Sequence, residues 1–366
     1  MNVIRPNIKY LLFLSILLSS LLSGCATQED QTNASNTNFD HELYDGKSTL
    51  GLSGDFPPET PTEAIIRGDK AYLEKNSDLA LYEYIRALSF PAQDKADQAY
   101  YKIGYIHQQR GNFELAKIAY SRAALINEDN IQYAASAGIV ELKLGENENA
   151  EKHLLRTIRM DQERQGKTDW DPNLDTFASK LSIDQSSPLN AYIAMGIIAD
   201  LDARHEQAQQ IYRSCLRVNG KSRPALTNLG YSYYLSGNAR QAEIINKRAT
   251  MLYPDDKRAW SNLGLIYIRS KRYEDALDSL QHAMSPAEAL NDIGYFSMLE
   301  GDYEASVNYL EQAINTSPTY YAKAHQNLKR AKKLQITAPP VKLTNKWGNE
   351  QSQATVFSIS ERIDEE

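Results

Sequence analysis

A glycine recurs in this chain about every 34 residues, and this repeat restricts the fold more than any other feature of the sequence. Glycine is uncommon here, at 18 of 366 residues, so a shared register is not accidental. The glycines of this column are Gly68, Gly104, Gly138, Gly196, Gly230, Gly264 and Gly294. A period of this length is typical of arrays that stack one supersecondary unit many times.

Two columns of small residues follow the glycines. The first holds Ala80, Ala116, Ala150, Ala208, Ala242, Ala276 and Ser306, and the second holds Ala87, Ala123, Thr157, Cys215, Ala249, Ala283 and Ala313. Between them lies a larger residue, in Tyr84, Tyr120, Leu154, Tyr212, Leu280 and Leu310, and Asn246 interrupts this column. Glycine inside a helix costs about 1 kcal/mol relative to alanine. Its retention predicts two antiparallel helices in close approach, with the larger residue filling the space toward the next hairpin.

Turn signals separate the two helices of each unit. Glycine precedes a polar residue at Gly111, Gly145, Gly237 and Gly301, which suits a left-handed residue after one helix and an N-cap for the next. Pro254 and Pro318 mark points where a second helix should stop.

These columns resemble the tetratricopeptide repeat over about residues 61–335. The resemblance implies an all-α superhelix of about seven helical hairpins plus a capping helix. We place the repeats at 61–94, 97–130, 131–164, 189–222, 223–256, 257–286 and 287–320. The sixth is short, because we expect Pro286 to end its second helix early. Residues 321–334 should form a polar cap, which the end of such an array requires.

The repeats divide the chain into an N-terminal array at 61–164 and a C-terminal array with its cap at 189–335. Between them, residues 165–188 form an insertion in which we expect a loop and a short helix near Leu174–Leu181; it could bend or split the superhelix. Residues 25–60 are rich in Asn, Thr, Asp, Gly and Pro and should be a flexible tether, and residues 336–366 should be a polar tail.

The N-terminus has the organisation of a secretory signal. Arg5 and Lys9 precede an apolar run from Leu11 to Leu22, and Leu22-Ser23-Gly24-Cys25 follows. This tetrapeptide resembles a bacterial lipobox, which implies removal of residues 1–24 and diacylation of Cys25. Ala26 stands where an aspartate would resemble an inner-membrane retention mark. We therefore expect a lipid-anchored protein on the periplasmic face of the outer membrane of a Gram-negative bacterium.

Composition argues against several functions. The net charge is −7 without a basic block, which disfavours nucleic-acid binding. If Cys25 is acylated, Cys215 has no disulfide partner and is best interpreted as a small buried thiol. The six histidines lie in separate segments and form no metal-binding motif; they are His41, His107, His153, His205, His282 and His325. We predict no enzyme activity, no cofactor, no metal and no small-molecule substrate.

A binding groove is the better candidate site. In tetratricopeptide arrays the first helix of each repeat lines the concave face. In the C-terminal array, the residue after each column glycine and the residue three further on should point inward. These positions form an apolar, Tyr-rich stripe able to hold an amphipathic helix or an extended peptide, made of Tyr231, Tyr234, Leu265, Ile268, Tyr295 and Met298.

The order of the last repeats suggests a family. Ala287–Tyr295 follows the shortened repeat, then Gly301-Asp302-Tyr303, Ser317-Pro318 and Asn327-Leu328. This order resembles the TadD family of tight-adherence (Flp) pilus assembly. The resemblance implies an outer-membrane scaffold that helps assemble a pilus or secretion apparatus by binding its secretin or the secretin's partners.

Three alternatives stay open. A lipidated repeat array also fits an adaptor for peptidoglycan hydrolases or a pilotin of a type IV pilus secretin. An active site within 165–188, using Trp170, Asp171 and Asp175, is the weakest alternative, because one short loop rarely supplies a complete site.

Overall fold

The computed structural model describes residues 40–46, 57–91, 94–167, 178 and 180–337, and the regular structure within these ranges is entirely helical. The N-terminal part contains η1 (His41–Leu43), α1 (Pro61–Leu73), α2 (Ser77–Leu88), α3 (Ala96–Gln109), α4 (Phe113–Ile126), α5 (Ile131–Lys143) and α6 (Asn147–Arg164). The C-terminal part contains α8 (Leu189–Leu201), α9 (His205–Val218), α10 (Arg223–Leu235), α11 (Ala239–Leu252), α12 (Lys257–Arg269), α13 (Tyr273–Leu280), α14 (Pro286–Leu299), α15 (Tyr303–Thr316) and α16 (Ala322–Thr337).

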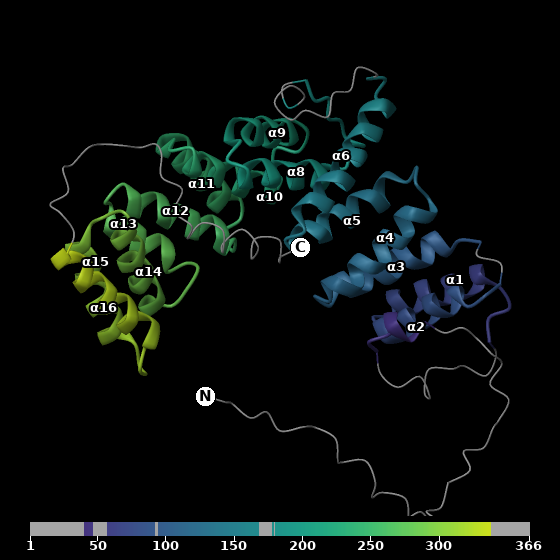
Figure 1. The fold of residues 1–366 in the computed structure, drawn as a ribbon, viewed down its shortest axis with the longest axis horizontal. Coiled ribbons are helices and arrows are strands. Elements are labelled where there is room, and N and C mark those ends of the chain that lie inside the picture. The colour runs from purple at the N-terminus through teal and green to yellow at the C-terminus, as the bar shows by residue number, and fades with distance from the viewer. Residues whose placement is uncertain (1–39, 47–56, 92–93, 168–177, 179, 338–366) are drawn as a thin grey trace, which may run out of the picture. The chain divides into compact units, whose positions relative to one another are not determined.

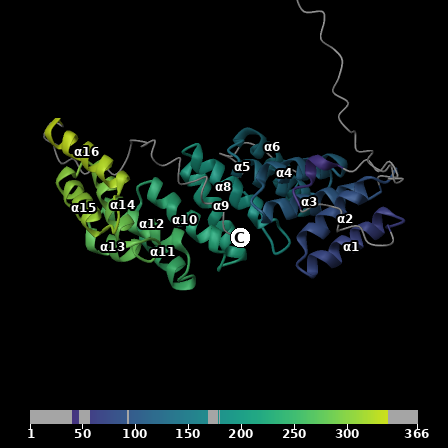
Figure 2. The same cartoon turned by 90° about the horizontal axis from the view of Figure 1, so that it is seen from below.

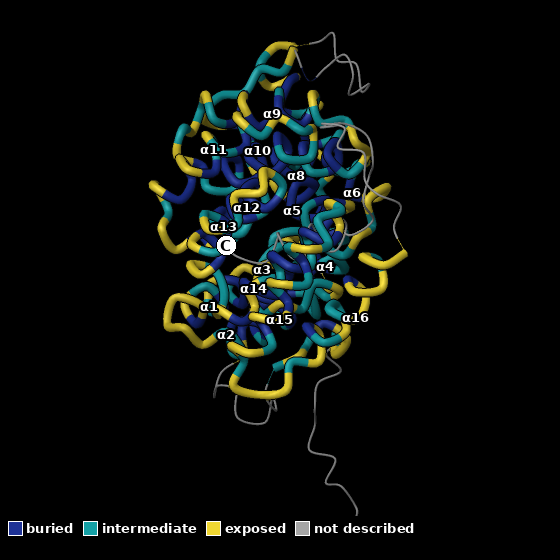
Figure 3. Tube along the Cα trace, turned by 90° about the vertical axis from the view of Figure 1, so that its left-hand side faces the viewer, coloured by how far each residue is buried: buried dark blue, intermediate teal, exposed yellow. Residues whose placement is uncertain are grey.

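These helices form antiparallel hairpins that stack in chain order. The pairs are α1/α2, α3/α4, α5/α6, α8/α9, α10/α11, α12/α13 and α14/α15, and α16 packs on α14 and α15 as a cap. Figures 1 and 2 show this succession from two directions. In Figure 3, dark blue buried segments lie where helices meet, and turns are mostly yellow. The tetratricopeptide-repeat superhelix expected from the sequence is confirmed.

Each column glycine lies under the larger residue of its own hairpin. A Cβ atom on Gly196 would lie 2.4 Å from the Tyr212 ring, and one on Gly264 would lie 2.5 Å from Leu280. The same relation holds at Gly68, Gly104, Gly138, Gly230 and Gly294. The prediction of close helix approach is confirmed. The larger residue covers the glycine of its own repeat and also packs toward the next hairpin, as Tyr120 does with Ala137 and Val140 of α5.

The turn between the two helices of each hairpin is left-handed in every repeat. The four glycines expected there have φ near +76 to +79°. The remaining repeats reach the same conformation without glycine, at Lys75, Ala203 and Lys271, with φ of 58–61°. A left-handed conformation costs a residue with a Cβ atom about 1–2 kcal/mol. The repeat geometry therefore imposes this turn even where the sequence does not favour it.

The sixth repeat is short for a different reason from the one expected. Helix α13 ends at Leu280, and Pro286 is the first residue of α14, where it suits the helix start. The Ser285 hydroxyl oxygen accepts a hydrogen bond from the Glu288 backbone N–H, and the Glu288 carboxylate accepts one from the Ser285 backbone N–H. This capping box and Pro286 start α14, whereas the sequence predicts that Pro286 ends the preceding helix.

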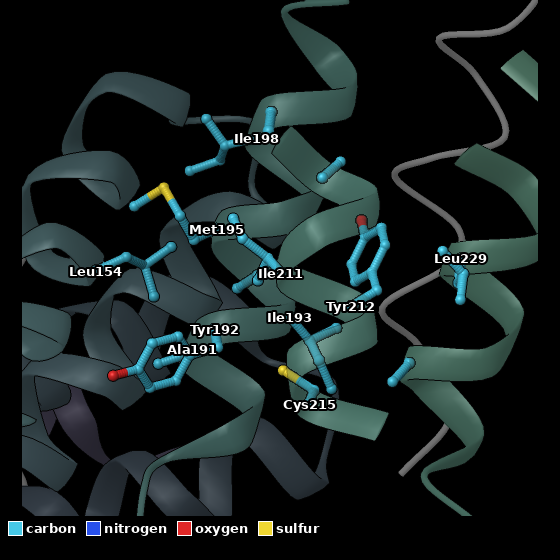
Figure 4. Close-up of a cluster of buried hydrophobic side chains, with 14 of the residues drawn as sticks. Leu154, Ala191, Tyr192, Ile193, Met195, Ile198, Ile211, Tyr212, Cys215 and Leu229 are labelled. Atoms are coloured by element: carbon cyan, nitrogen blue, oxygen red, sulfur yellow. The ribbon is translucent and has the colours of Figure 1, made fainter. Parts of the chain in front are cut away.

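The insertion does not split the array, because α8 packs directly on α5 and α6. One apolar core continues across the junction and joins Leu154 of α6 to Met195 and Tyr192 of α8 (Figure 4). The Tyr192 hydroxyl donates to the buried Asp161 carboxylate at 2.7 Å, which adds a polar tie. Most of the helix expected near Leu174–Leu181, and Trp170, Asp171 and Asp175, lie outside the described residues.

Part of the expected tether is packed on the array. Residues Asp40–Gly46 lie against the first two repeats, and Leu43 is completely buried there. The rest of 25–60 up to Phe56, the signal sequence with Cys25, and the tail from residue 338 lie outside the described residues. Among the residues that the structure does describe, no helix has the length and apolarity that a bilayer crossing requires.

Candidate protein-binding surface

The predicted stripe begins on α10 with two stacked tyrosines. The Tyr231 and Tyr234 rings lie 5.8 Å apart at 24°. Tyr231 is buried, whereas Tyr234 is partly exposed. The Arg269 guanidinium of α12 lies 5.3 Å from the centre of the Tyr234 ring and donates to the Tyr234 carbonyl at 3.2 Å. Contacts with a second ring and a cation already restrict the side chain of Tyr234. Binding a partner would therefore cost this tyrosine little additional side-chain entropy.

The stripe continues on α12 and α14, where two of its four side chains are buried. Leu265 is partly exposed, but Ile268 is buried in the core shared by α12, α13 and α14. On α14, Met298 is buried with Leu310 and Ala331, and Tyr295 packs against the same cluster. Ala331 belongs to α16, so the cap helix covers this end of the stripe. Within the described residues, the accessible predicted positions are therefore mainly Tyr234, Leu265 and part of Tyr295.

A second aromatic surface lies on the first helices of the N-terminal array. Tyr72 of α1 and Tyr105 of α3 meet edge to face at 5.8 Å, and each is about two-fifths exposed. The hydrogen bond between the two hydroxyls raises the pKa of Tyr72. Ile66 and Leu73, also on α1, are more exposed. This surface lies outside the stripe predicted from the sequence, which is confined to the C-terminal array.

The glycine-relative positions that define the predicted stripe also identify both tyrosines. Tyr105 follows Gly104 directly, and Tyr72 lies four residues after Gly68. Between these helices Lys102 pairs with Asp69 at 2.7 Å. The surface therefore carries two tyrosines, a residue type enriched at protein interfaces, next to a charged pair of the kind found at their polar rims.

The described residues offer little for catalysis. No group of three or more potential metal ligands occurs among them. Cys215 is completely buried, and burial raises the pKa of its thiol to about 12. A thiol with that pKa stays protonated at neutral pH and is a poor nucleophile.

One hydrogen-bonded group involves the residue types of a hydrolase triad. Asp200 accepts from the Ser232 hydroxyl at 2.7 Å and lies 2.9 Å from Nδ1 of His205. The carboxylate lies between the other two, whereas general-base activation needs the histidine beside the serine. Ser232 is also completely buried. The group therefore ties α8, α9 and α10 together.

Comparisons with known proteins agree with the repeat assignment. A family model described as "Tetratricopeptide repeat" matches residues 97–130 and 287–320, which are two of the repeats placed from the sequence. A second model of the same description matches residues 227–289. A curated relative, the outer dynein arm-docking complex subunit 4 of Danio rerio, is 25% identical over 211 residues. That alignment covers 53% of this chain and 40% of the relative, so this chain spans less than half of that protein.

A solved structure shows the same fold. A tetratricopeptide repeat protein from Parabacteroides merdae has a TM-score of 0.52 and 17% identity, with 75% of this chain and all of that chain covered. The Pseudomonas aeruginosa pilF structure has a TM-score of 0.45 and 16% identity over 66% of this chain and 98% of its own. At these identities the likeness concerns the fold alone. By its repeat pattern and its helix packing, this chain has the tetratricopeptide-repeat fold.

Proposed function

We propose that this protein is a lipid-anchored scaffold at the periplasmic face of the outer membrane, where it helps assemble a tight-adherence pilus or secretion apparatus by binding the secretin or its partners. Three observations support the proposal: the Leu22–Cys25 lipobox, the stacked hairpins, and the TadD-like order of the last repeats. Tetratricopeptide arrays act by binding other proteins, so we assign this chain no enzymatic step.

The observation that carries the binding role is the aromatic lining of the first helices. Tyr234 with Leu265, and Tyr72 with Tyr105, place partly exposed apolar side chains on the first helices of neighbouring repeats. A peptide that crosses successive repeats would bury such rings with little entropy loss, since tyrosine has only two side-chain torsions. Lipid attachment and binding then act together, because anchoring raises the effective concentration of scaffold at a membrane-bound partner.

Cross-linked capture from detergent-solubilised envelopes tests this function. The full chain should retain a secretin or a pilus-assembly component. Tyr234→Ser combined with Leu265→Ser should reduce capture about tenfold or more if the C-terminal surface binds, since buried aromatic anchors dominate interfaces. Tyr72→Ser combined with Tyr105→Ser tests the N-terminal surface in the same way.

Tyr320→Ser is the matched control. Tyr320 is 77% exposed and lies on neither surface. Its loss should leave capture unchanged, and circular dichroism should show equal helix content in all variants. Recovery of a cell-wall hydrolase would favour the adaptor role, and recovery of a type IV pilus secretin would favour the pilotin role. Undiminished capture by both double variants would exclude these surfaces.

A further inference from the structure

The segment Asp40–Gly46, here called the clasp, packs against the first two repeats. Residues 47–60 separate it in the sequence from α1, the first helix of the array. Its leucine, Leu43, is completely buried among side chains that include Leu81 of α2 and Ile103 and Ile106 of α3. Tyr44 lies edge-on to Tyr82 of α2, with the ring centres 6.4 Å apart. The clasp therefore supplies part of the N-terminal core (Figure 1, purple).

Polar contacts fix the clasp on both sides of Leu43. The Leu43 carbonyl lies 2.9 Å from Nε2 of the buried His107, and because a carbonyl only accepts, His107 donates. Before Leu43, Asp40 pairs with Arg122 of α4 at 2.8 Å. After it, Asp45 pairs with Arg110 at 2.5 Å and accepts from Asn112.

Residues of the first repeat hold Arg110, which binds the clasp, in its orientation. Arg110 bonds Asp78 at 2.7 Å and Ser77 at 2.9 Å, both on α2, so the cation that holds Asp45 is oriented by the first repeat. The clasp thus contacts α2, α3 and α4 together. A buried apolar anchor between two charge-assisted contacts is the pattern of a specific docking site.

Chain connectivity favours docking. Residues 47–60 join the clasp to α1, so docking closes a short loop rather than recruiting a free peptide. Loop closure of this length is inexpensive, and the effective concentration of a short linked segment is on the order of millimolar. Modest contacts are therefore enough to keep the clasp bound.

We propose that the clasp is the mechanical attachment point of the array, so that only residues 26–39, and not the whole segment to residue 60, set how far the array reaches from its lipid. This proposal rests on the lipidation of Cys25 in the proposed function. A fully extended chain spans at most about 50 Å from Cys25 to Asp40, but about 120 Å from Cys25 to Pro61. Docking the clasp therefore shortens the limit of reach by more than half.

The first experiment tests docking alone, by amide hydrogen exchange on the full chain in detergent. The Leu43 and Tyr44 amides donate within the clasp and should be protected. Leu43→Asp should speed their exchange about tenfold or more while α3 and α4 keep their protection. Asp40→Arg and Arg122→Glu should each weaken docking, and combining them should restore it in part, because Arg122 also lies 3.7 Å from Glu42 of the clasp. Failure of both the apolar and the charge variants to change exchange would overturn the clasp.

The second experiment tests reach, with the lipidated chain in vesicles that carry a headgroup-labelled lipid. A dye at Lys70→Cys, an exposed position on α1, reports the distance to the bilayer by energy transfer. A Gly/Ser insertion of about 24 residues, which spans about 25–30 Å root-mean-square, is placed either between Ser35 and Asn36 or between Ser53 and Gly54. The upstream insertion should lower transfer, and the downstream insertion of equal length should leave it unchanged.

The two insertions should have the same effect on energy transfer once the clasp no longer docks. In a Leu43→Asp background both should lower transfer alike. Equal effects of the insertions in the unmodified chain would overturn the reach proposal. Absence of energy transfer in the chain without an insertion would mean that Cys25 does not anchor the protein. That result would contradict both the proposed membrane location and the reach proposal. The hydrogen-exchange experiment would still test clasp docking. Failure to find a pilus partner affects neither experiment.

Discussion

At the scale of single residues, the repeat explains which side chains are tolerated and which are out of place. Asn246 occupies the column where other repeats have tyrosine or leucine, and it is completely buried over Gly230. Its Nδ2 donates to the Ala242 carbonyl at 2.9 Å, but its Oδ1 has no hydrogen-bond partner in the described structure. A buried unsatisfied carbonyl costs about 1–3 kcal/mol.

We therefore predict that Asn246→Leu stabilises the protein by about 1–2 kcal/mol. Leucine already fills this place over Gly264 and Gly294, so its volume suits the site. Urea unfolding followed by circular dichroism measures the change. Asn149→Leu, at an exposed position of α6, should leave the midpoint unchanged, and a lower midpoint for Asn246→Leu would contradict the interpretation.

His107 makes the folded N-terminal repeats sensitive to acid. Burial lowers the pKa of His107, against smaller opposing effects of the Leu43 carbonyl and Asp45, and Arg110 lowers it further. Because the pKa of His107 in the folded protein is below the ordinary value, folding of the N-terminal repeats favours the neutral ring. This contribution to stability is therefore full above about pH 6.5 and is lost as the pH falls below that value, by at most about tenfold per unit for one proton.

Hydrogen exchange of α3 and of the clasp between about pH 7.5 and 5.5, corrected for intrinsic rates, measures this dependence. His107→Gln is the matched control, because its amide still donates to the Leu43 carbonyl but does not titrate. The control should show a flatter pH profile. An identical profile in both proteins would assign the acid sensitivity to other groups.

At the scale of helices, α16 determines how much of the predicted stripe is open. Ala331 is completely buried against Met298 and Leu310, and the side of α16 turned to solvent carries lysines such as Lys333. A terminal helix with one apolar and one polar face completes a repeat array that otherwise exposes its last hairpin.

Ala331→Asp should detach this cap. A buried unpaired carboxylate should destabilise the last repeat by about 2–4 kcal/mol, and because repeats contact mainly their neighbours, α1–α6 should keep their stability. Hydrogen exchange should rise in α14–α16 alone, and Tyr295 should become more accessible. Lys333→Asp introduces the same residue on the exposed side and should have little effect; uniform loss of protection along the chain would be inconsistent with local capping.

At the scale of the whole molecule, the two cysteines test the anchor independently of any partner. Cys215 is buried and its pKa is raised, so it should not react in the native protein. A diacylated Cys25 carries its lipid as a thioether and has no free thiol. Membrane-extracted protein should therefore show no reactive thiol when native and one after denaturation in urea. A reactive thiol in the native state would argue against lipidation.

Much of the array could be predicted from the sequence because its determinants are local and repeated. Glycine, alanine and a large residue at fixed spacing specify one hairpin, and the copies stack because each leaves an apolar face uncovered. The approach of Gly196 and Tyr212, which are 16 residues apart, is such a short-range consequence. The left-handed turn at Ala203 could not be foreseen, because no glycine marks it.

What the sequence by itself determined is the repeat, its period and the pairing of helices, since these depend on side chains within one unit. Only the tertiary structure decided what covers the surface: α16 over Met298, α8 directly on α5 and α6 across the insertion, and Leu43 in the core of the first repeats. These contacts join segments that do not follow one another in the regular spacing of the repeats. They form because the fold brings the segments together in space, and the residue spacing along the chain does not predict that.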